Sequence, residues 1–178
     1  MGLTLQPTDT VWSVSAGGTA GELWAGSDNG KVWKRSGPTG SNGTWTSEQA
    51  LPAGNSVFSV SYSGGTVFAV GQRGWVGVRR SGTWQNYQYT DLAGSTMGRA
   101  DALYGVSALN ADSAVAVGTK GLAVRYTTGS WKPGTVKIDP NGNEFNAVWT
   151  SASGRSYAVA YNGLIVRLDS NLSATQLR

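Results

Sequence analysis

The amino-acid sequence predicts an all-β protein, a β-propeller of four blades that each hold four strands and about 45 residues. Four segments repeat at nearly constant spacing along the 178 residues, and each repeat carries a glycine-containing turn at the same place. Only 13% of the residues are charged, whereas Gly, Val, Ser, Thr and Trp are abundant. Such a composition is typical of short strands joined by tight turns.

The first strand of each unit is the clearest landmark. Its four copies occupy residues 11–16, 57–62, 103–108 and 145–150, so that successive copies start 46, 46 and 42 residues apart. A second apolar strand follows each copy, at residues 22–26, 66–70, 113–117 and 156–160. Four matching pairs of strands at one period indicate an internal repeat.

A turn that ends in glycine follows each second strand. The four turns are Asp28–Gly30, Gln72–Gly74, Thr119–Gly121 and Tyr161–Gly163. The residue before Gly in such a two-residue hairpin often needs positive φ. Third strands follow at residues 31–34, 75–79, 122–125 and 164–167, and a more polar fourth strand completes each unit. We expect the first strands to be the most apolar, as in a blade that radiates from a central axis. We also expect the blades to stack on one another, because a single sheet cannot bury both of its faces.

A Gly-Thr/Ser-Trp step precedes the fourth strand in three repeats. Residues 117–125 followed by Gly129-Ser130-Trp131 give the clearest copy of the whole pattern. This pattern resembles bacterial and phage propeller repeats related to the Asp-box (BNR-like) type, and the resemblance covers nearly the whole chain. It implies a fold and no activity. The aspartate of an Asp-box is missing from the corresponding turns here.

The chain is interpreted as one propeller domain over residues 1–178, with repeats at about 8–52, 53–99, 100–141 and 142–178. Propellers have four to eight blades. Four units therefore either close into a small ring or form half of a larger ring that a second copy completes. The sequence leaves both arrangements open.

Several kinds of chemistry are excluded or disfavoured by composition. The chain has no Cys and no His, which excludes disulfides, thiolate metal ligands, cysteine nucleophiles and histidine bases. We expect no enzyme activity, no metal and no cofactor. No apolar run reaches the length of a membrane span and no signal-peptide pattern opens the chain, so we expect a cytoplasmic or virion-incorporated protein unless a leader was removed. The net charge of +4 includes no basic run and does not favour nucleic acid.

Two sets of repeated side chains are candidate ligand contacts. Cations follow the turn glycine by four or five positions, and they could form equivalent sites for an acidic sugar or phosphate, or simply keep strand ends soluble. The Trp of each Gly-Thr/Ser-Trp step could stack on a sugar or pack between blades. We favour the structural interpretation in both cases. The candidates are Arg79, Arg125 and Arg167 (with Lys34) and Trp45, Trp84 and Trp131.

The remaining tryptophans and one insert complete the candidates. Trp12, Trp24, Trp33, Trp75 and Trp149 fall on strand positions and are predicted to pack in the core or between blades. Residues 89–101, between the second and third repeats, depart from the repeat, and irregular loops on rigid scaffolds often bind ligands. The insert offers Tyr89, Arg99 and Asp101.

Three functions remain open at this point. The first is a non-enzymatic interaction module or structural subunit, such as a phage virion component, with a protein partner or self-association. The second is a lectin that binds carbohydrate at repeated sites on its blades. The third is a sialidase-like hydrolase, which the missing acid/base equipment disfavours. The propeller fold is compatible with all three.

Overall fold

The computed structural model describes residues 9–88, 101–135 and 142–178. Four antiparallel sheets of four strands each make up the protein, and every sheet is a meander of consecutive strands. This confirms the predicted all-β propeller-type architecture. We call the sheets blade 1 to blade 4. Blade 1 consists of β1 (Val11–Ala16), β2 (Leu23–Ser27), β3 (Lys31–Ser36) and β4 (Thr44–Gln49).

The other blades repeat this order. Blade 2 holds β5 (Val57–Ser63), β6 (Thr66–Gly71), β7 (Trp75–Arg80) and β8 (Thr83–Gln88). Blade 3 holds β9 (Leu103–Asn110), β10 (Ser113–Gly118), β11 (Leu122–Thr127) and β12 (Ser130–Thr135). Blade 4 holds β13 (Phe145–Thr150), β14 (Ser156–Ala160), β15 (Ile165–Leu168) and β16 (Ala174–Gln176).

The turns between second and third strands have the predicted backbone. Asn29, Arg73 and Lys120 have φ between 54° and 58°, and the glycine after each has φ between 68° and 74°. Positive φ at two successive central residues closes a tight hairpin and matches the twist of the flanking strands. A larger residue tolerates this conformation poorly at the second position, which explains the glycine in each copy.

Burial within a blade differs from the expected gradient. The second strands β6 and β10 are almost wholly buried, whereas the first strands alternate between buried and partly exposed residues. The first strands lie at the inner edge of each sheet, where only one strand of their own sheet pairs with them. The second strand has partners on both edges and a blade on each face, and this explains its deeper burial.

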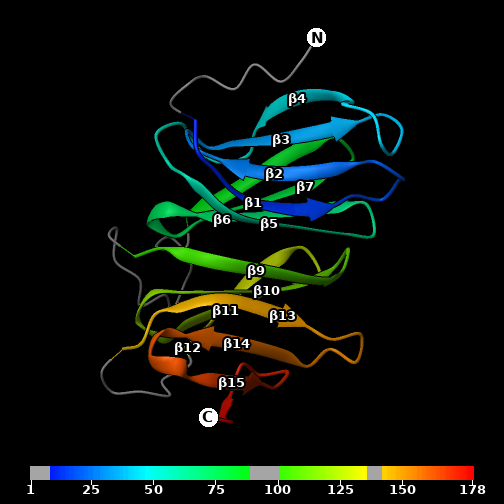
Figure 1. Ribbon diagram of the computed structural model, residues 1–178. Coiled ribbons are helices and arrows are strands. Elements are labelled where there is room, and N and C mark those ends of the chain that lie inside the picture. The colour runs from blue at the N-terminus through cyan, green and yellow to red at the C-terminus, as the bar shows by residue number, and fades with distance from the viewer. Residues whose placement is uncertain (1–8, 89–100, 136–141) are drawn as a thin grey trace.

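The blades stack in chain order. The packing contacts run from β1 to β5, from β5 to β9 and from β9 to β13, so the four first strands lie side by side as inner strands. Figure 1 shows the stack from blade 1, beside the N-terminal end, to blade 4, beside the C-terminal end. In the part of the chain that the structure describes, no strands of blades 1 and 4 share a packing interface. The stack is therefore open at both ends.

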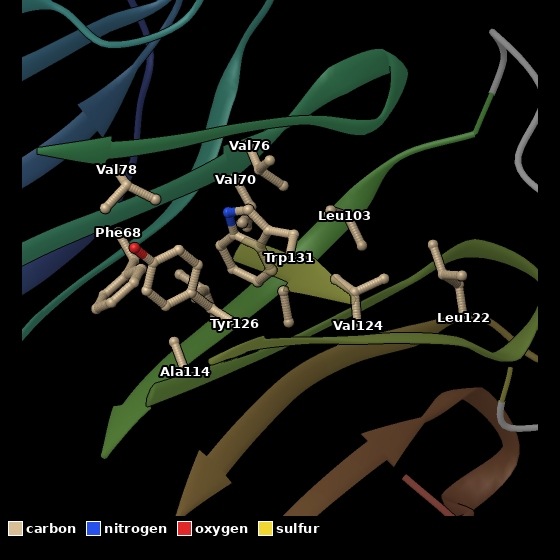
Figure 2. Packing of buried hydrophobic residues seen from close by; sticks show 12 residues of the cluster. Phe68, Val70, Val76, Val78, Leu103, Ala114, Leu122, Val124, Tyr126 and Trp131 are labelled. Carbon is tan, nitrogen blue, oxygen red and sulfur yellow. The ribbon is translucent and has the colours of Figure 1, made fainter. Parts of the chain in front are cut away.

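The core lies between blades rather than within one. Between blades 2 and 3, Phe68 contacts Tyr126 with ring centroids 5.1 Å apart, and Tyr126 contacts Trp131 at 5.3 Å, both edge to face. Valines of blade 2 and aliphatic residues of blade 3 surround these rings (Figure 2). Burial of such rings supplies the main stabilising term of a blade junction.

A second device joins the inner strands. Serine hydroxyls on one inner strand accept hydrogen bonds from backbone N–H groups of the next, at 2.9–3.2 Å. We call this set the hydroxyl ladder; its donor and acceptor pairs are Val60 to Ser13, Tyr62 to Ser15, Val106 to Ser59, Ala108 to Ser61 and Thr150 to Ser107. It satisfies amides of the inner edge that no strand pairs with.

Blade 3 has Gly105 where blades 1 and 2 have the first serine of the ladder. A side chain at Gly105 would meet the backbone of Ala147 at 3.0 Å, so the inner strands of blades 3 and 4 approach too closely for one. Glycine is needed here for close packing, and the third junction consequently has a single rung.

Among the described residues, no helix is long and apolar enough to cross a membrane.

Candidate interaction surfaces

Each blade has two faces, which we name by the neighbour they meet. The leading face meets the preceding blade and the trailing face meets the following one. Val60 and Ala69 of blade 2 pack against Trp24 of blade 1 and define a leading face. Phe68 and Val76 pack against blade 3 and define a trailing face. Alternation along each strand sends successive side chains to opposite faces.

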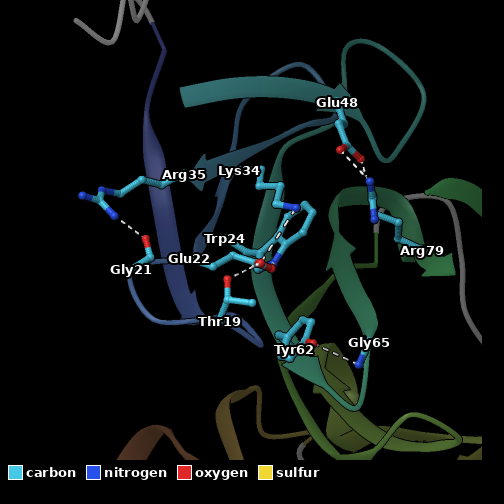
Figure 3. Close-up of polar contacts among 10 residues, drawn as sticks. All are labelled: Thr19, Gly21, Glu22, Trp24, Lys34, Arg35, Glu48, Tyr62, Gly65 and Arg79. Atoms are coloured by element: carbon cyan, nitrogen blue, oxygen red, sulfur yellow. Dashed lines mark hydrogen bonds and ion pairs between the residues drawn. The ribbon is translucent and has the colours of Figure 1, made fainter. Parts of the chain in front are cut away.

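The junction of blades 1 and 2 is built around Trp24. Its ring lies between Lys34 and Arg79, whose charged groups are 5.1 and 5.0 Å from the centroid. Arg79 donates two hydrogen bonds to Glu48, at 2.5 and 2.9 Å (Figure 3). Trp84 donates a third to the same carboxylate at 2.7 Å. Cation–π contacts and a bidentate ion pair therefore join the blades.

The predicted cations do not lie in equivalent places. Arg79 pairs with Val67 and shares its leading face, whereas Lys34 pairs with Trp24 on a trailing face. Arg125 and Arg167 match Lys34 by strand register. A shift of one residue along a strand reverses the face. The geometry thus divides these cations between the two faces of the blades.

Arg125 and Arg167 differ in their surroundings. Arg125 donates to the backbone carbonyl of Asp169 at 3.1 Å, across the junction of blades 3 and 4. Burial lowers the pKa of Arg125, and the nearby Asp169 opposes this effect. Arg125 also lines a hollow of about 290 Å³ with Lys132 and Asn171. Arg167 is exposed on blade 4, and no other blade of the described structure packs on that face.

The three tryptophans of the Gly-Thr/Ser-Trp steps share one repeat position with different burial. Trp131 is 5% exposed within the core between blades 2 and 3. Trp84 packs at the junction of blades 1 and 2 and donates to Glu48. Trp45 lies at the matching place on blade 1, opposite Arg35, and no blade precedes it. These positions are junction positions, and only the first copy lies at an open end.

Two residues of the insert, Tyr89 and Arg99, lie outside the described residues. Asp101 is buried, and its carboxylate forms an ion pair with Lys120 at 2.9 Å. This contact joins the loop before β9 to the turn after β10 in the same blade. Asp101 therefore has a structural contact whether or not it also binds a ligand.

The two end blades carry most of the exposed apolar side chains among the described residues. Among the described residues, eight large apolar side chains are exposed, and seven belong to blade 1 or blade 4. Val14 on the leading face of blade 1 is 64% exposed, whereas the matching Val60 and Val106 are 5% and 7% exposed. Trp149 and Val159 are exposed in the same way on the trailing face of blade 4. Such patches mark interaction sites.

These exposures correct one sequence expectation. Trp24 is buried as predicted, but Trp12 and Trp149 are exposed although strand positions suggested packing. Trp149 occupies the place of the ladder serines Ser15, Ser61 and Ser107, and it stacks on Tyr157 with centroids 6.2 Å apart. It lies on the last blade, so no following blade covers it.

A third surface lies at the start of the inner strands. The second residues of β1, β5 and β9 are Trp12, Phe58 and Tyr104. The ring centroids of Trp12 and Phe58 are 5.2 Å apart, and those of Phe58 and Tyr104 are 5.4 Å apart. We call this row of three rings the axial rim. Trp12 is half exposed, and the other two rings are partly exposed. Three blades therefore contribute to one continuous aromatic surface.

Acidic groups lie at both ends of the axial rim. Asp28 accepts hydrogen bonds from Trp12 Nε1 and Ser56 Oγ, both at 2.8 Å, and from the Thr10 amide at 3.0 Å. Partial burial alone would raise the pKa of Asp28, but these hydrogen bonds outweigh it and hold the pKa below its ordinary value.

At the other end of the rim, burial raises the pKa of the Tyr104 hydroxyl, and the nearby Glu144, Tyr161 and Asp101 add to the effect. A neutral phenol is thereby favoured at ordinary pH. The rim combines aromatic faces with hydrogen-bonding groups, as protein-binding surfaces do. In the described ranges, no cluster of three acidic, His or Cys side chains could hold a metal ion.

Comparison with known proteins identifies the fold. No protein-family model matches the chain, and no curated protein sequence does. Solved propellers match its structure, including the Pan2 WD40 domain of Neurospora crassa (12% identity, TM-score 0.70, 97% of this chain and 50% of that chain). The virginiamycin B lyase of Staphylococcus aureus also matches (16% identity, TM-score 0.72, 96% and 56%), as do the RRP9 WD40 repeats (10% identity, TM-score 0.70, 94% and 52%).

These comparisons concern the fold alone, because all the identities are low. The chain spans about half the length of these propellers. WD40 domains and a lyase share the architecture, so the fold does not decide between scaffold and enzyme. Nothing in the comparisons supports the Asp-box resemblance specifically.

Proposed function

We propose that this chain is a non-enzymatic interaction scaffold that docks a partner protein on the axial rim. The observation that carries the proposal is the row formed by Trp12, Phe58 and Tyr104, which three separate blades hold in mutual contact. Aromatic rings are enriched at the centres of protein interfaces because they bury a large apolar area and lose little side-chain freedom. The blades fix these rings before a partner arrives.

The rigid setting of the rim supports this function. Trp12 is tied to Asp28, and Asp28 also accepts from Ser56 of the loop that leads into blade 2. Phe58 and Tyr104 lie on inner strands that the hydroxyl ladder joins. A preorganised surface avoids part of the ordering cost of association. The WD40 domains among the structural neighbours share this propeller architecture.

A displayed library of random peptides, panned on the purified protein, tests the docking function. We expect enriched peptides with an apolar anchor whose binding falls at least about tenfold in a Trp12→Ala, Tyr104→Ala double variant. Tyr87→Ala removes an exposed aromatic ring from outer strand β8 and is the matched control. Peptides that bind the double variant as well as the unaltered protein would contradict docking on the rim.

A structural-subunit role, including the virion setting, is the second candidate. The exposed apolar residues of the end blades favour it, since such a face needs a neighbour. The carbohydrate alternative draws less support, because Trp131 is enclosed in the core and Trp84 packs in a junction. Trp131 therefore offers no open face on which a sugar can stack, and Trp84 is only partly exposed.

A further inference from the structure

We propose that a second copy of this chain covers both open faces, with blade 4 of each copy packed against blade 1 of the other in an eight-bladed ring. This assembly is separate from docking on the axial rim. Two copies related by a two-fold axis along the propeller axis would form two identical new junctions. A ring of eight blades lies within the known range of propellers.

The chain carries both halves of a blade junction at its two ends. At the junction of blades 1 and 2, the trailing face presents Trp24 with the cation Lys34 beside it. Strand register places Tyr157 and Arg167 at these two positions on the open trailing face of blade 4. An aromatic residue beside a cation is therefore present on a face that no blade covers.

The leading face of blade 1 supplies the complementary half. At the junction of blades 1 and 2, the leading face presents Arg79 and Trp84. Arg35 and Trp45 pair with each other on blade 1 at the matching positions, just as Arg79 pairs with Trp84. The same classes of side chain thus recur at matching strand positions of the two end blades, with the Arg35 guanidinium turned to the backbone carbonyls of its own blade.

Apolar burial provides the driving force for this contact. Val14 and Val159 are 64% and 42% exposed, whereas their equivalents Val60 and Val117 are 5% and 0% exposed. A neighbour at each end would bury both residues as the internal junctions do.

The new junction would differ from the internal ones in two ways. Ala147 and Trp149 replace the ladder serines, so the hydroxyl contacts to the next inner strand are exchanged for one large aromatic side chain. The place of Glu48 holds no acidic residue, because Ile165 matches Val32 by strand register, and Leu177 and Arg178 lie opposite Ile165. An acidic acceptor is not required there, because Arg35 already donates to the backbone carbonyls of Gly21, Pro38 and Ser41.

Site-directed cross-linking tests the eight-bladed ring. Because the sequence contains no Cys, the introduced cysteines are the only thiols that can react. Ser13 accepts from the Val60 amide at the internal junction, so the equivalent pair at the proposed junction is Ala147 of one copy and Val14 of the other. We expect a Val14→Cys, Ala147→Cys variant treated with a short bismaleimide to give a covalent product of twice the chain mass. A Ser13→Cys, Val60→Cys variant should cross-link within one chain and is the positive control.

Two further variants make the result decisive. Ala152→Cys places a thiol on an exposed loop of blade 4 and, with Val14→Cys, should give at least tenfold less product. Val159→Asp added to the Val14→Cys, Ala147→Cys pair should abolish the product, and because Val159 is exposed in one copy the blade itself should still fold. Failure of the pair to join two chains while the positive control reacts would overturn the ring. So would cross-linking within a single chain, which would mean that four blades close by themselves.

Discussion

Val60 and Val14 occupy the same position in successive repeats, yet their side chains are 5% and 64% exposed. Both lie on a first strand that pairs with its own second strand. The difference comes from the preceding blade, which Val60 has and Val14 lacks. Burial in this fold is therefore a property of the junction between blades, and the two end blades keep the residues of a junction without its partner.

The largest effect is expected from the core ring Phe68 and its match Tyr157. Phe68 is fully buried between blades 2 and 3, so Phe68→Ala should lower the free energy of unfolding by about 3–5 kcal/mol. Tyr157→Ala at the same position of blade 4 should cost less than half as much in dilute solution. Chemical denaturation monitored by circular dichroism measures both, and equal losses would break the distinction between junction and open end.

A smaller effect is expected at Glu48, which bridges blades 1 and 2. Glu48→Ala removes the acceptor for both Arg79 and Trp84, and we expect a loss of about 1.5–3 kcal/mol in the free energy of unfolding. A double-mutant cycle with Arg79→Ala isolates their coupling. Arg155→Ala on an exposed loop of blade 4 is the matched control and should have almost no effect. A Glu48 loss as small as this control would contradict the bridging role.

The hydroxyl ladder should contribute about 1 kcal/mol for each rung. Ser61→Ala leaves the Ala108 amide without its acceptor, and its free energy of unfolding should fall by about 0.5–1.5 kcal/mol. Ser153→Ala removes an exposed loop hydroxyl and should change it far less. Faster hydrogen exchange at Ala108 in Ser61→Ala would locate the effect, and unchanged exchange would argue against the rung.

The smallest effect is a pH dependence at Asp28. Hydrogen bonds hold its pKa in the folded protein below the unfolded value of 3.8, so the folded state binds fewer protons. Its stabilising contribution is present above pH 3.8 and is lost as the pH falls through the folded pKa. The denaturation midpoints of the unaltered protein and Asp28→Asn should differ at pH 7 and converge in acid. A difference that is the same at both pH values would contradict the assignment.

The sequence was sufficient for the blades because their signals are local. Asn29-Gly30 and Lys120-Gly121 mark hairpins through their own backbone preferences, and the alternation in β5 or β9 does not depend on distant residues. For the Trp of each Gly-Thr/Ser-Trp step, the sequence analysis favoured packing between blades over ligand binding. Trp84 and Trp131 do pack at blade junctions. Their role in ligand binding stays a prediction.

The face on which each cation lies and the exposure of the end blades could not be predicted from the repeat pattern, because the copies look equivalent in sequence. Lys34 and Arg79 look equivalent by distance from the turn glycine, yet one residue of register sends them to opposite faces. Trp12 and Trp149 resemble core residues because the sequence pattern alone does not identify which copies lack a neighbour. One signal was available: Trp149 replaces the serine that the other three repeats have at this place, and it does so on the last blade.

The mass of the unaltered protein in solution, measured by light scattering during size-exclusion chromatography, tests the central claim most directly. If the open faces of blades 1 and 4 are two halves of a junction, the protein should elute as a single species of twice 18.6 kDa. The mass should return to 18.6 kDa in Val159→Asp, with the fold retained. A mass of 18.6 kDa for the unaltered protein at every concentration would contradict the claim.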